Sequence, residues 1–174
     1  MRPALLLCLL LAAGPAVAAD THPFSIHDML AMDRIAEPRV SPDGTKVAFT
    51  VRVTDLEANR GRTDVWLAAT DGSWTRRLTS HEAADSQARW APDGKALYFV
   101  STRSGSSQVF KLSLEGGEAE AVTRLPLDVD ALEVAPGGRA LLLAMAVFPG
   151  QSPEQTKAAM EAREKAKASG LLHD

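Results

Sequence analysis

The sequence predicts an all-β fold, namely a partial β-propeller of about two and a half four-stranded blades. A short N-terminal helix and a C-terminal helical insertion complete it. Three observations support this prediction: a proline–glycine turn motif occurs three times, its copies share the residues that follow, and turn residues separate short β-branched and aromatic segments. Four short strands in about 40–45 residues are typical of a propeller blade.

Composition narrows the class of protein. The chain has 174 residues, which suits one domain or a part of a larger one. The formal net charge is −3, so no basic surface indicates a nucleic-acid partner. No block of five or six like charges occurs, so no disordered charged tail is indicated. The proportions of glycine, proline, cysteine and apolar residues exclude a collagen-like protein, a disulfide framework and a multi-span membrane protein.

Residues 1–19 have the pattern of a secretory signal peptide. The apolar run Ala4–Ala13 is followed by Gly14-Pro15 and by small residues, which predicts cleavage after Ala18 or Ala19 and a periplasmic or secreted protein. The run is only about ten residues long, whereas roughly 20 are needed to span a bilayer. A buried N-terminal helix is the alternative. Cleavage would remove Cys8, leaving no disulfide, thiol nucleophile or cysteine-based zinc site.

Residues 20–37 form a lead-in to the repeats. Ser25 is placed to cap a short helix over Ile26–Ala31, with Asp28 at the third helical position. Two roles are open for this helix: contact with another domain, or a simple cap on the first blade.

The turn motif divides the rest of the chain, residues 38–174, into three blades. Ser41–Gly44 recurs as Ala91–Gly94 and as Ala135–Gly138, with proline-to-proline spacings of 50 and 44 residues. The difference of 6 residues lies at Asp55–Gly61, which indicates an insertion confined to one loop. We place blade one at about 38–85, blade two at about 86–129 and an incomplete blade three at about 130–174. A β-sandwich with coincidental turns is the alternative.

Blade two illustrates the expected strands. The first strand ends at the turn, where proline presets φ and Gly94 is expected to adopt a positive φ. The later strands contain the β-branched and aromatic residues that favour β-structure. Their expected ranges are Ala88–Trp90, Lys95–Val100, Gln108–Leu114 and Ala119–Thr123, and the second strand of blade one is expected at Lys46–Val51.

A second helix is predicted at about 153–169. Ser152 provides an N-cap, Pro153 occupies the first helical position and Gln155 the third, while Gly170 would end the helix. Met160 is the only large apolar side chain in its central part, so we expect a mostly solvated helix. It follows the second strand of blade three, so the chain ends within a structural unit.

The sequence contains no recognisable catalytic, cofactor-binding or metal-binding motif. No G-x-S-x-G string occurs; Gly72-Ser73 and Ser104–Ser107 read as hairpin turns. We therefore predict no catalytic residue, cofactor or metal site in this chain, and expect His81-Glu82 to lie in a solvated inter-blade loop. The four histidines form no metal-binding spacing: His22, His27, His81 and His173.

The Ser-Pro-Asp-Gly-x-x-Val-Ala-Phe pattern at 41–49 resembles the propeller repeat of periplasmic TolB-like proteins and of S9 (prolyl oligopeptidase family) serine peptidases. The opening segment Pro23–Ile35 runs directly into the first repeat. This order of signal peptide, short helix and repeats is similar to secreted bacterial dipeptidyl-aminopeptidase/acylaminoacyl-peptidase-like members. The tail Lys165–Gly170 also resembles an insertion in those members. The resemblance covers Pro23 to Asp174.

This resemblance implies an N-terminal propeller fragment of an S9-type serine peptidase. In that family the Ser, Asp and His of catalysis lie in a C-terminal α/β-hydrolase domain, which is missing here, and the propeller restricts access to short peptides. The partners implied are short peptide substrates of the full-length enzyme, with no nucleic acid and no membrane span. Two alternatives stay open: a TolB-like periplasmic binding module without catalysis, and a non-functional gene fragment.

Overall fold

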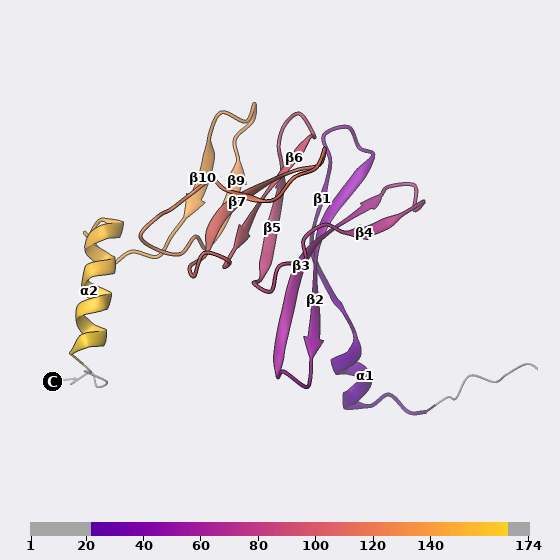
Figure 1. The fold of residues 1–174 in the computed structure, drawn as a ribbon, viewed down its shortest axis with the longest axis horizontal. Helices are drawn as coiled ribbons and strands as arrows, with labels where there is room; N and C mark the ends of the chain where they lie inside the picture. Colours follow the sequence, from indigo (N-terminus) through magenta and orange to yellow (C-terminus); the bar gives the residue numbers. More distant parts are fainter. Residues whose placement is uncertain (1–21, 167–174) are drawn as a thin grey trace, which may run out of the picture.

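The computed structural model describes residues 22–166. The predicted signal peptide, the helix cap at Gly170 and His173 lie outside the described residues. Two four-stranded antiparallel sheets and one two-stranded sheet follow one another along the chain (Figure 1). The strand orders are β1-β2-β3-β4, β5-β6-β7-β8 and β10-β9. The fold is therefore a partial β-propeller, as the repeats predict.

The helices and strands correspond closely to the predicted elements. Their bounds are α1 Ile26–Ala31, β1 Arg34–Val40, β2 Lys46–Asp55, β3 Arg60–Ala69, β4 Thr75–Arg77, β5 Asp85–Trp90, β6 Ala96–Ser101, β7 Gln108–Ser113, β8 Glu120–Ala121, β9 Ala131–Val134, β10 Leu141–Ala144 and α2 Pro153–Lys165. Neither helix in this described part is long and apolar enough to cross a membrane.

Helix α1 is held by its N-cap. The Ser25 hydroxyl accepts from the Asp28 N–H, and the Asp28 carboxylate accepts from the Ser25 N–H at 2.7 Å. This reciprocal capping box satisfies two of the free donors at the start of the helix. The Ser25 bonds hold the pKa of Asp28 below its usual range. The predicted helix and cap are confirmed, and β1 begins only three residues after α1 ends, so the first strand starts inside the lead-in 20–37.

The insertion in blade one was predicted wrongly as a longer loop. It lengthens β2 and β3 instead, which pair continuously from Lys46↔Ala69 to Asp55↔Arg60. Only Leu56–Asn59 remain outside the ladder, and Asn59 takes the positive φ of 47° needed to turn the chain. The residues added to β2 and to β3 pair with each other, and this antiparallel pairing satisfies their backbone N–H and C=O groups. The six extra residues therefore extend the hairpin and do not form a longer loop. The hairpin and α1 project at the same end of the molecule (Figure 1).

The three turn motifs share one geometry. In each, the residue before the proline exchanges hydrogen bonds across the hairpin, as in Ala91 N–H to the Ala96 carbonyl at 2.9 Å and Gly94 N–H to the Ala91 carbonyl at 2.9 Å. The glycines that close these turns have positive φ, with 69° at Gly94. In the first copy the Ser41 hydroxyl donates to Asp43 at 2.6 Å and holds the pKa of that exposed carboxyl far below its usual range.

The core lies between the sheets. The face of blade one that carries Ala48, Val65 and Leu67 packs against Leu97, Phe99 and Phe110 of blade two, among other residues of one cluster. The opposite face of blade two packs on blade three, where the second cluster contains Val100, Val109, Val129 and Leu132. Strand alternation places the apolar residues of each blade on two faces, so consecutive blades bury both.

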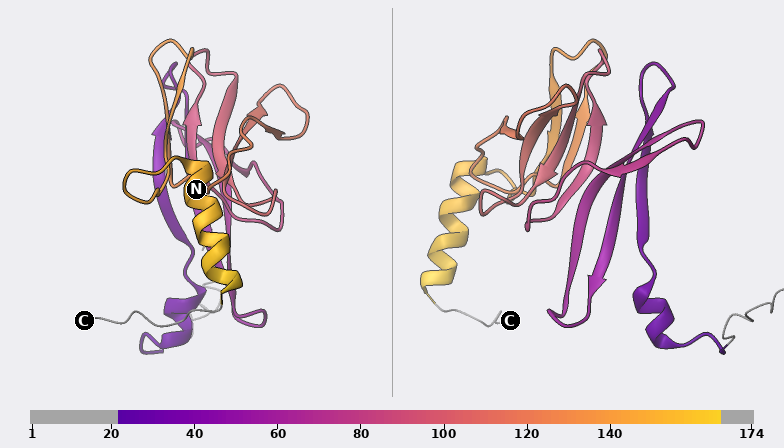
Figure 2. Two further views of the ribbon diagram at one scale, coloured as in Figure 1. Left: turned by 90° about the vertical axis from the view of Figure 1, so that its left-hand side faces the viewer. Right: turned by 45° about the vertical axis from the view of Figure 1, so that its right-hand side comes forward.

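Helix α2 follows β10 and ends at Lys165, shorter within the described residues than the predicted 153–169. The Ser152 cap, Pro153 and the Gln155 capping box are confirmed. Met160 is exposed, as a solvated helix predicts, but Thr156 is buried and its hydroxyl accepts from the Phe148 N–H at 3.1 Å. The helix lies beyond β10, at one end of the row of blades (Figures 1 and 2).

Candidate functional site

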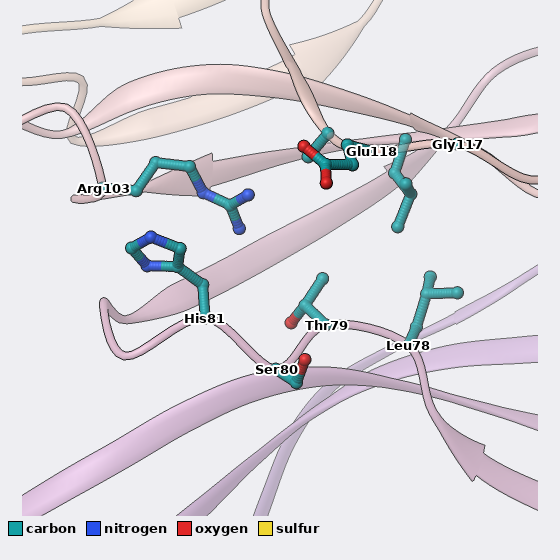
Figure 3. A pocket seen from close by; sticks show the side chains of 9 residues that line it. Leu78, Thr79, Ser80, His81, Arg103, Gly117 and Glu118 are labelled. Atoms are coloured by element: carbon teal, nitrogen blue, oxygen red, sulfur yellow. The ribbon is translucent and has the colours of Figure 1, made fainter.

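A groove of about 420 Å³ opens between blades one and two (Figure 3). Its walls come from the inter-blade segment after β4, the loop after β6 and the turn before β8, so residues far apart in the sequence meet there. The lining residues are Leu78, Thr79, Ser80, His81, Arg103, Leu112, Gly117, Glu118 and Ala119.

Arg103 is the most firmly held charge of this groove. Its Nη2 donates to Asp85 Oδ2 at 2.7 Å and its Nε donates to the Ser101 hydroxyl at 2.9 Å. The guanidinium also lies over the rings of Phe99 and Phe110, 5.3 and 5.0 Å from their centroids. Cations stack favourably on aromatic faces, so four partners hold this one cation. Arg103 was not singled out from the sequence, since its partner Asp85 lies 18 residues away.

Asp85 belongs to the interior rather than to the groove. It is 0% exposed at the start of β5, and its second oxygen, Oδ1, has no hydrogen-bond partner. Burying a carboxylate is costly in free energy unless it is paired with a cation. Asp85 can therefore be buried as a charged group only because Arg103 pairs with it. The pair Asp64–Arg77 in blade one is similar, with Nη2 at 2.7 Å from Oδ2.

The histidines do not form a catalytic arrangement within the described residues. His81 lies in the exposed inter-blade loop, as predicted, and its Nδ1 accepts from the Ala83 N–H at 3.0 Å. The ring hydrogen bonds of His22 and His81 both run to the backbone. Residues 22–166 also contain no group of three or more His, Cys, Asp and Glu side chains that could hold a metal ion.

The serine-rich segments form turns. Ser104 donates to the Ser106 carbonyl at 3.3 Å and Gly105 has a φ of 90°. Likewise Ser73 N–H donates to Asp71 at 2.9 Å in the turn before β4. A nucleophile elbow places its serine on a sharp strand-to-helix connection, whereas these serines join antiparallel strands.

A second cleft, of about 690 Å³, lies between α2 and the loops of blade two. Asp128 is fixed in it by accepting from the Ser107 N–H at 2.7 Å. Both apolar and charged residues line the cleft: Gly105, Ser106, Leu125, Pro126, Leu127, Asp128, Lys157, Met160, Glu161 and Glu164.

A row of charges crosses the first strands of the three blades. Arg39, Arg89 and Glu133 each stand three residues before the turn proline of their repeat. Arg89 Nη2 is 2.9 Å from Glu133 Oε1, and Arg39 Nη2 is 3.8 Å from the same oxygen. The hydrogen bond from Arg89 holds the pKa of Glu133 below its usual range.

The repeated blades and their shared turns define a β-propeller module. Its site region contains no catalytic nucleophile arrangement or metal cluster among the described residues. Comparison with known families agrees: residues 31–164 match the model described as "TolB beta propeller domain". The chain therefore belongs to the TolB β-propeller domain family.

Curated relatives of this chain include peptidases. An uncharacterized peptidase, YuxL, from Bacillus subtilis (strain 168) is 29% identical over 148 residues, which cover 84% of this chain and 22% of the relative. Dipeptidyl-peptidase 5 from Porphyromonas endodontalis is 26% identical over 114 residues, which cover 66% of this chain and 16% of the relative. This chain thus spans about a fifth of the length of these relatives or less. The predicted resemblance to S9 peptidase propellers is confirmed at this level.

Solved structures with the same fold include both kinds of protein that the sequence resembles. The AtxE2 isopeptidase matches with a TM-score of 0.62 at 20% identity, over 87% of this chain and 27% of its own. A TolB from Agrobacterium tumefaciens matches with a TM-score of 0.51 at 24% identity, over 62% and 36%. At sequence identities of 20% and 24%, the similarity to these structures shows a shared fold and nothing further.

Proposed function

We propose that this chain is the N-terminal propeller portion of a secreted S9-type serine peptidase that cleaves short peptides. The observation that carries the proposal is the combination of a partial ring of TolB-type blades with peptidase relatives of which it covers 22% and 16%. The remaining length of such relatives has room for further blades and for a hydrolase domain. The residues 1–19, read as a signal peptide, support export to the periplasm or beyond.

In this proposal the propeller controls which substrates reach the active site and supplies no catalytic residue. A Ser–His–Asp mechanism requires a serine hydroxyl hydrogen-bonded to a histidine that a carboxylate orients. The hydrogen bonds of histidine rings within residues 22–166 run to backbone groups, and His22 Nε2 is 3.6 Å from Asp28 Oδ1 without a serine hydroxyl on its ring. The first strands of the blades carry the charged row Arg39, Arg89 and Glu133, which would face a peptide entering along the axis of a complete ring. Chains too bulky for that opening would be excluded, which limits substrates to short peptides.

The decisive experiment is to sequence the genomic DNA downstream of the Asp174 codon. The proposal predicts an open or frameshifted reading frame that encodes further blades and then a G-x-S-x-G segment. A protein expressed from the restored frame should react with a fluorophosphonate probe for active serines and hydrolyse dipeptidyl or acyl-aminoacyl substrates. Failure of the restored protein to do either would reject the peptidase proposal.

A TolB-like binding module is the second candidate. The fold match to the Agrobacterium tumefaciens TolB and the family model support it. Further blades followed by a stop codon, with no G-x-S-x-G segment, would favour this candidate. A stop codon without further blades would favour a gene fragment.

A further inference from the structure

Glu37 and Gln87 occupy the same position of the repeat and share an unusual backbone conformation. Each stands five residues before the turn proline of its blade. The register between the first and second strands shifts at both places. φ is 53° at Glu37 and 55° at Gln87, although residues other than glycine rarely adopt a positive φ. Both residues therefore lie in β-bulges, which are devices that re-aim a side chain.

The re-aimed side chains bind the first strand of the next blade. Glu37 Oε2 accepts from the Gln87 N–H at 3.0 Å, which joins blade one to blade two. Gln87 joins blade two to blade three: its Nε2 donates to the Asp130 carbonyl at 2.7 Å, and its Oε1 accepts from the Leu132 N–H at 3.2 Å. We call these three hydrogen bonds the bulge clasp.

The bulge accompanies the polar side chain in the three blades described. Ala131 stands at the same repeat position in blade three, five residues before Pro136. Its side chain has no hydrogen-bonding group, and β9 pairs with β10 without a shift of register. The bulge is thus present in the two blades whose side chain at this position binds the following blade.

Backbone preference alone does not explain Glu37 and Gln87. A left-handed backbone costs free energy, and glycine or asparagine adopts it most readily. Asn59, at the turn between β2 and β3, follows that preference with a φ of 47°. Glu37 and Gln87 are longer and carry their polar atoms at the end of the side chain. These are the features that the hydrogen bonds to the next blade require.

The bulge clasp lies beside the row of charges Arg39, Arg89 and Glu133. Glu133 directly follows the segment that Gln87 binds, and Arg89 lies two residues after Gln87. The indole N–H of Trp90 donates to the Arg39 carbonyl at 2.8 Å, which holds β1 against β5 at the same level. The Glu133 side chain is 58% exposed, so packing does not fix its carboxylate. Its place beside Arg89 depends on where the clasp holds the backbone before it.

We propose that Gln87 and Glu37 are positioning residues for this row of charges. Their side chains set the spacing of the first strands of the three blades, so that Arg89 meets Glu133 across the junction between blades two and three. The proposal goes beyond the proposed function. Its test uses no substrate, so failure of the peptidase proposal and failure of this one are separate results.

The test compares the full chain with its Gln87→Gly and Gln87→Met variants. Both remove the amide, but glycine also tolerates the positive φ and keeps the N–H that Glu37 binds. Carbon-13 NMR of the side-chain carboxyl during a pH titration measures the pKa of Glu133. We expect this pKa to rise toward the ordinary glutamate value in both variants, because Arg89 is no longer held against it. The pKa of Glu154, in the first turn of α2, is the internal reference and should not change.

Stability provides a second readout with a matched control. Asn59→Gly also places glycine at a positive φ, and the Asn59 side chain forms no hydrogen bond within residues 22–166. In urea denaturation, Gln87→Gly should lower the ratio of folded to unfolded chain by roughly fivefold or more, since two hydrogen bonds between blades are lost. Asn59→Gly should leave that ratio unchanged or raise it.

Glu37 is tested by a pair of variants that both remove its charge. Glu37→Gln keeps an oxygen that can accept from the Gln87 N–H, whereas Glu37→Met does not. The pKa of Glu133 should therefore be higher in Glu37→Met than in Glu37→Gln, and equal values would overturn the role of Glu37. For Gln87, an unchanged pKa of Glu133 in the folded variants would overturn the proposal. So would a Gln87→Gly chain as stable as the wild type.

Discussion

Pro92 of one turn lies against Gly138 of the next. A Cβ atom added to Gly138 would be 2.9 Å from both Cδ and Cγ of Pro92. The turns of blades two and three are therefore stacked, and glycine is required at Gly138 both by its φ of 72° and by the neighbouring ring. The third copy of the motif, Ala-Pro-Gly-Gly, differs from the others but keeps this glycine.

The stacked turns predict a difference between two adjacent glycines. Gly137 also has a positive φ, of 85°, but its added Cβ would meet nothing within 4 Å. Gly138→Ala should therefore lower the free energy of unfolding by about 1–3 kcal/mol more than Gly137→Ala, because only the former crowds Pro92. Urea denaturation of both variants measures this difference, and equal losses would contradict the stacking.

Removing the cation of the buried ion pair Asp85–Arg103 in blade two should cause a large loss of stability. Arg103→Met leaves the charge of Asp85, which is 0% exposed, without its cation. Breaking such a pair from one side costs about 3–5 kcal/mol. Thermal or urea unfolding should show this loss, whereas the control Lys95→Met breaks an exposed pair with Glu115 and should change stability by about 1 kcal/mol or less. Similar effects of the two substitutions would contradict the role of Arg103 as the partner of Asp85.

Glu133 predicts a small dependence of stability on pH. Its pKa is lowered in the folded chain by the hydrogen bond from Arg89. The stabilisation it contributes is therefore present above the ordinary pKa of a glutamate and is lost as pH falls through the lowered value. Glu133→Gln should reduce stability near neutral pH by about 1 kcal/mol or less, because the carboxylate is largely exposed. The difference from wild type should disappear in acid; a difference that grows in acid would reverse the assignment.

The isolated chain should hydrolyse no peptide or ester substrate. No G-x-S-x-G segment occurs in the sequence, so no serine stands in the motif that forms a nucleophile elbow. Dipeptidyl and acyl-aminoacyl chromogenic substrates measure this activity directly. Turnover that disappears when one serine of this chain is replaced would contradict the prediction, and replacement of Ser106, in a turn, serves as the first variant.

Much of the fold follows from local sequence. The proline–glycine turns, the Ser25 and Ser152 caps and the alternation of apolar residues act over a few residues, because turns and caps satisfy nearby backbone groups. For this reason the strands of blade two and both helices were predicted within a few residues. The hairpin of β2 and β3 was not, because a loop and an extended ladder of equal length differ only in cross-strand pairing.

Only the tertiary structure determines how the blades pack against one another. The sequence by itself determined three repeats, their strands and their turns. It did not bring Arg103 to Asp85, place Glu133 beside Arg89 and Arg39, or form the groove around His81, since these partners belong to different strands or blades. Such contacts depend on the twist and packing of whole sheets, which no local pattern encodes.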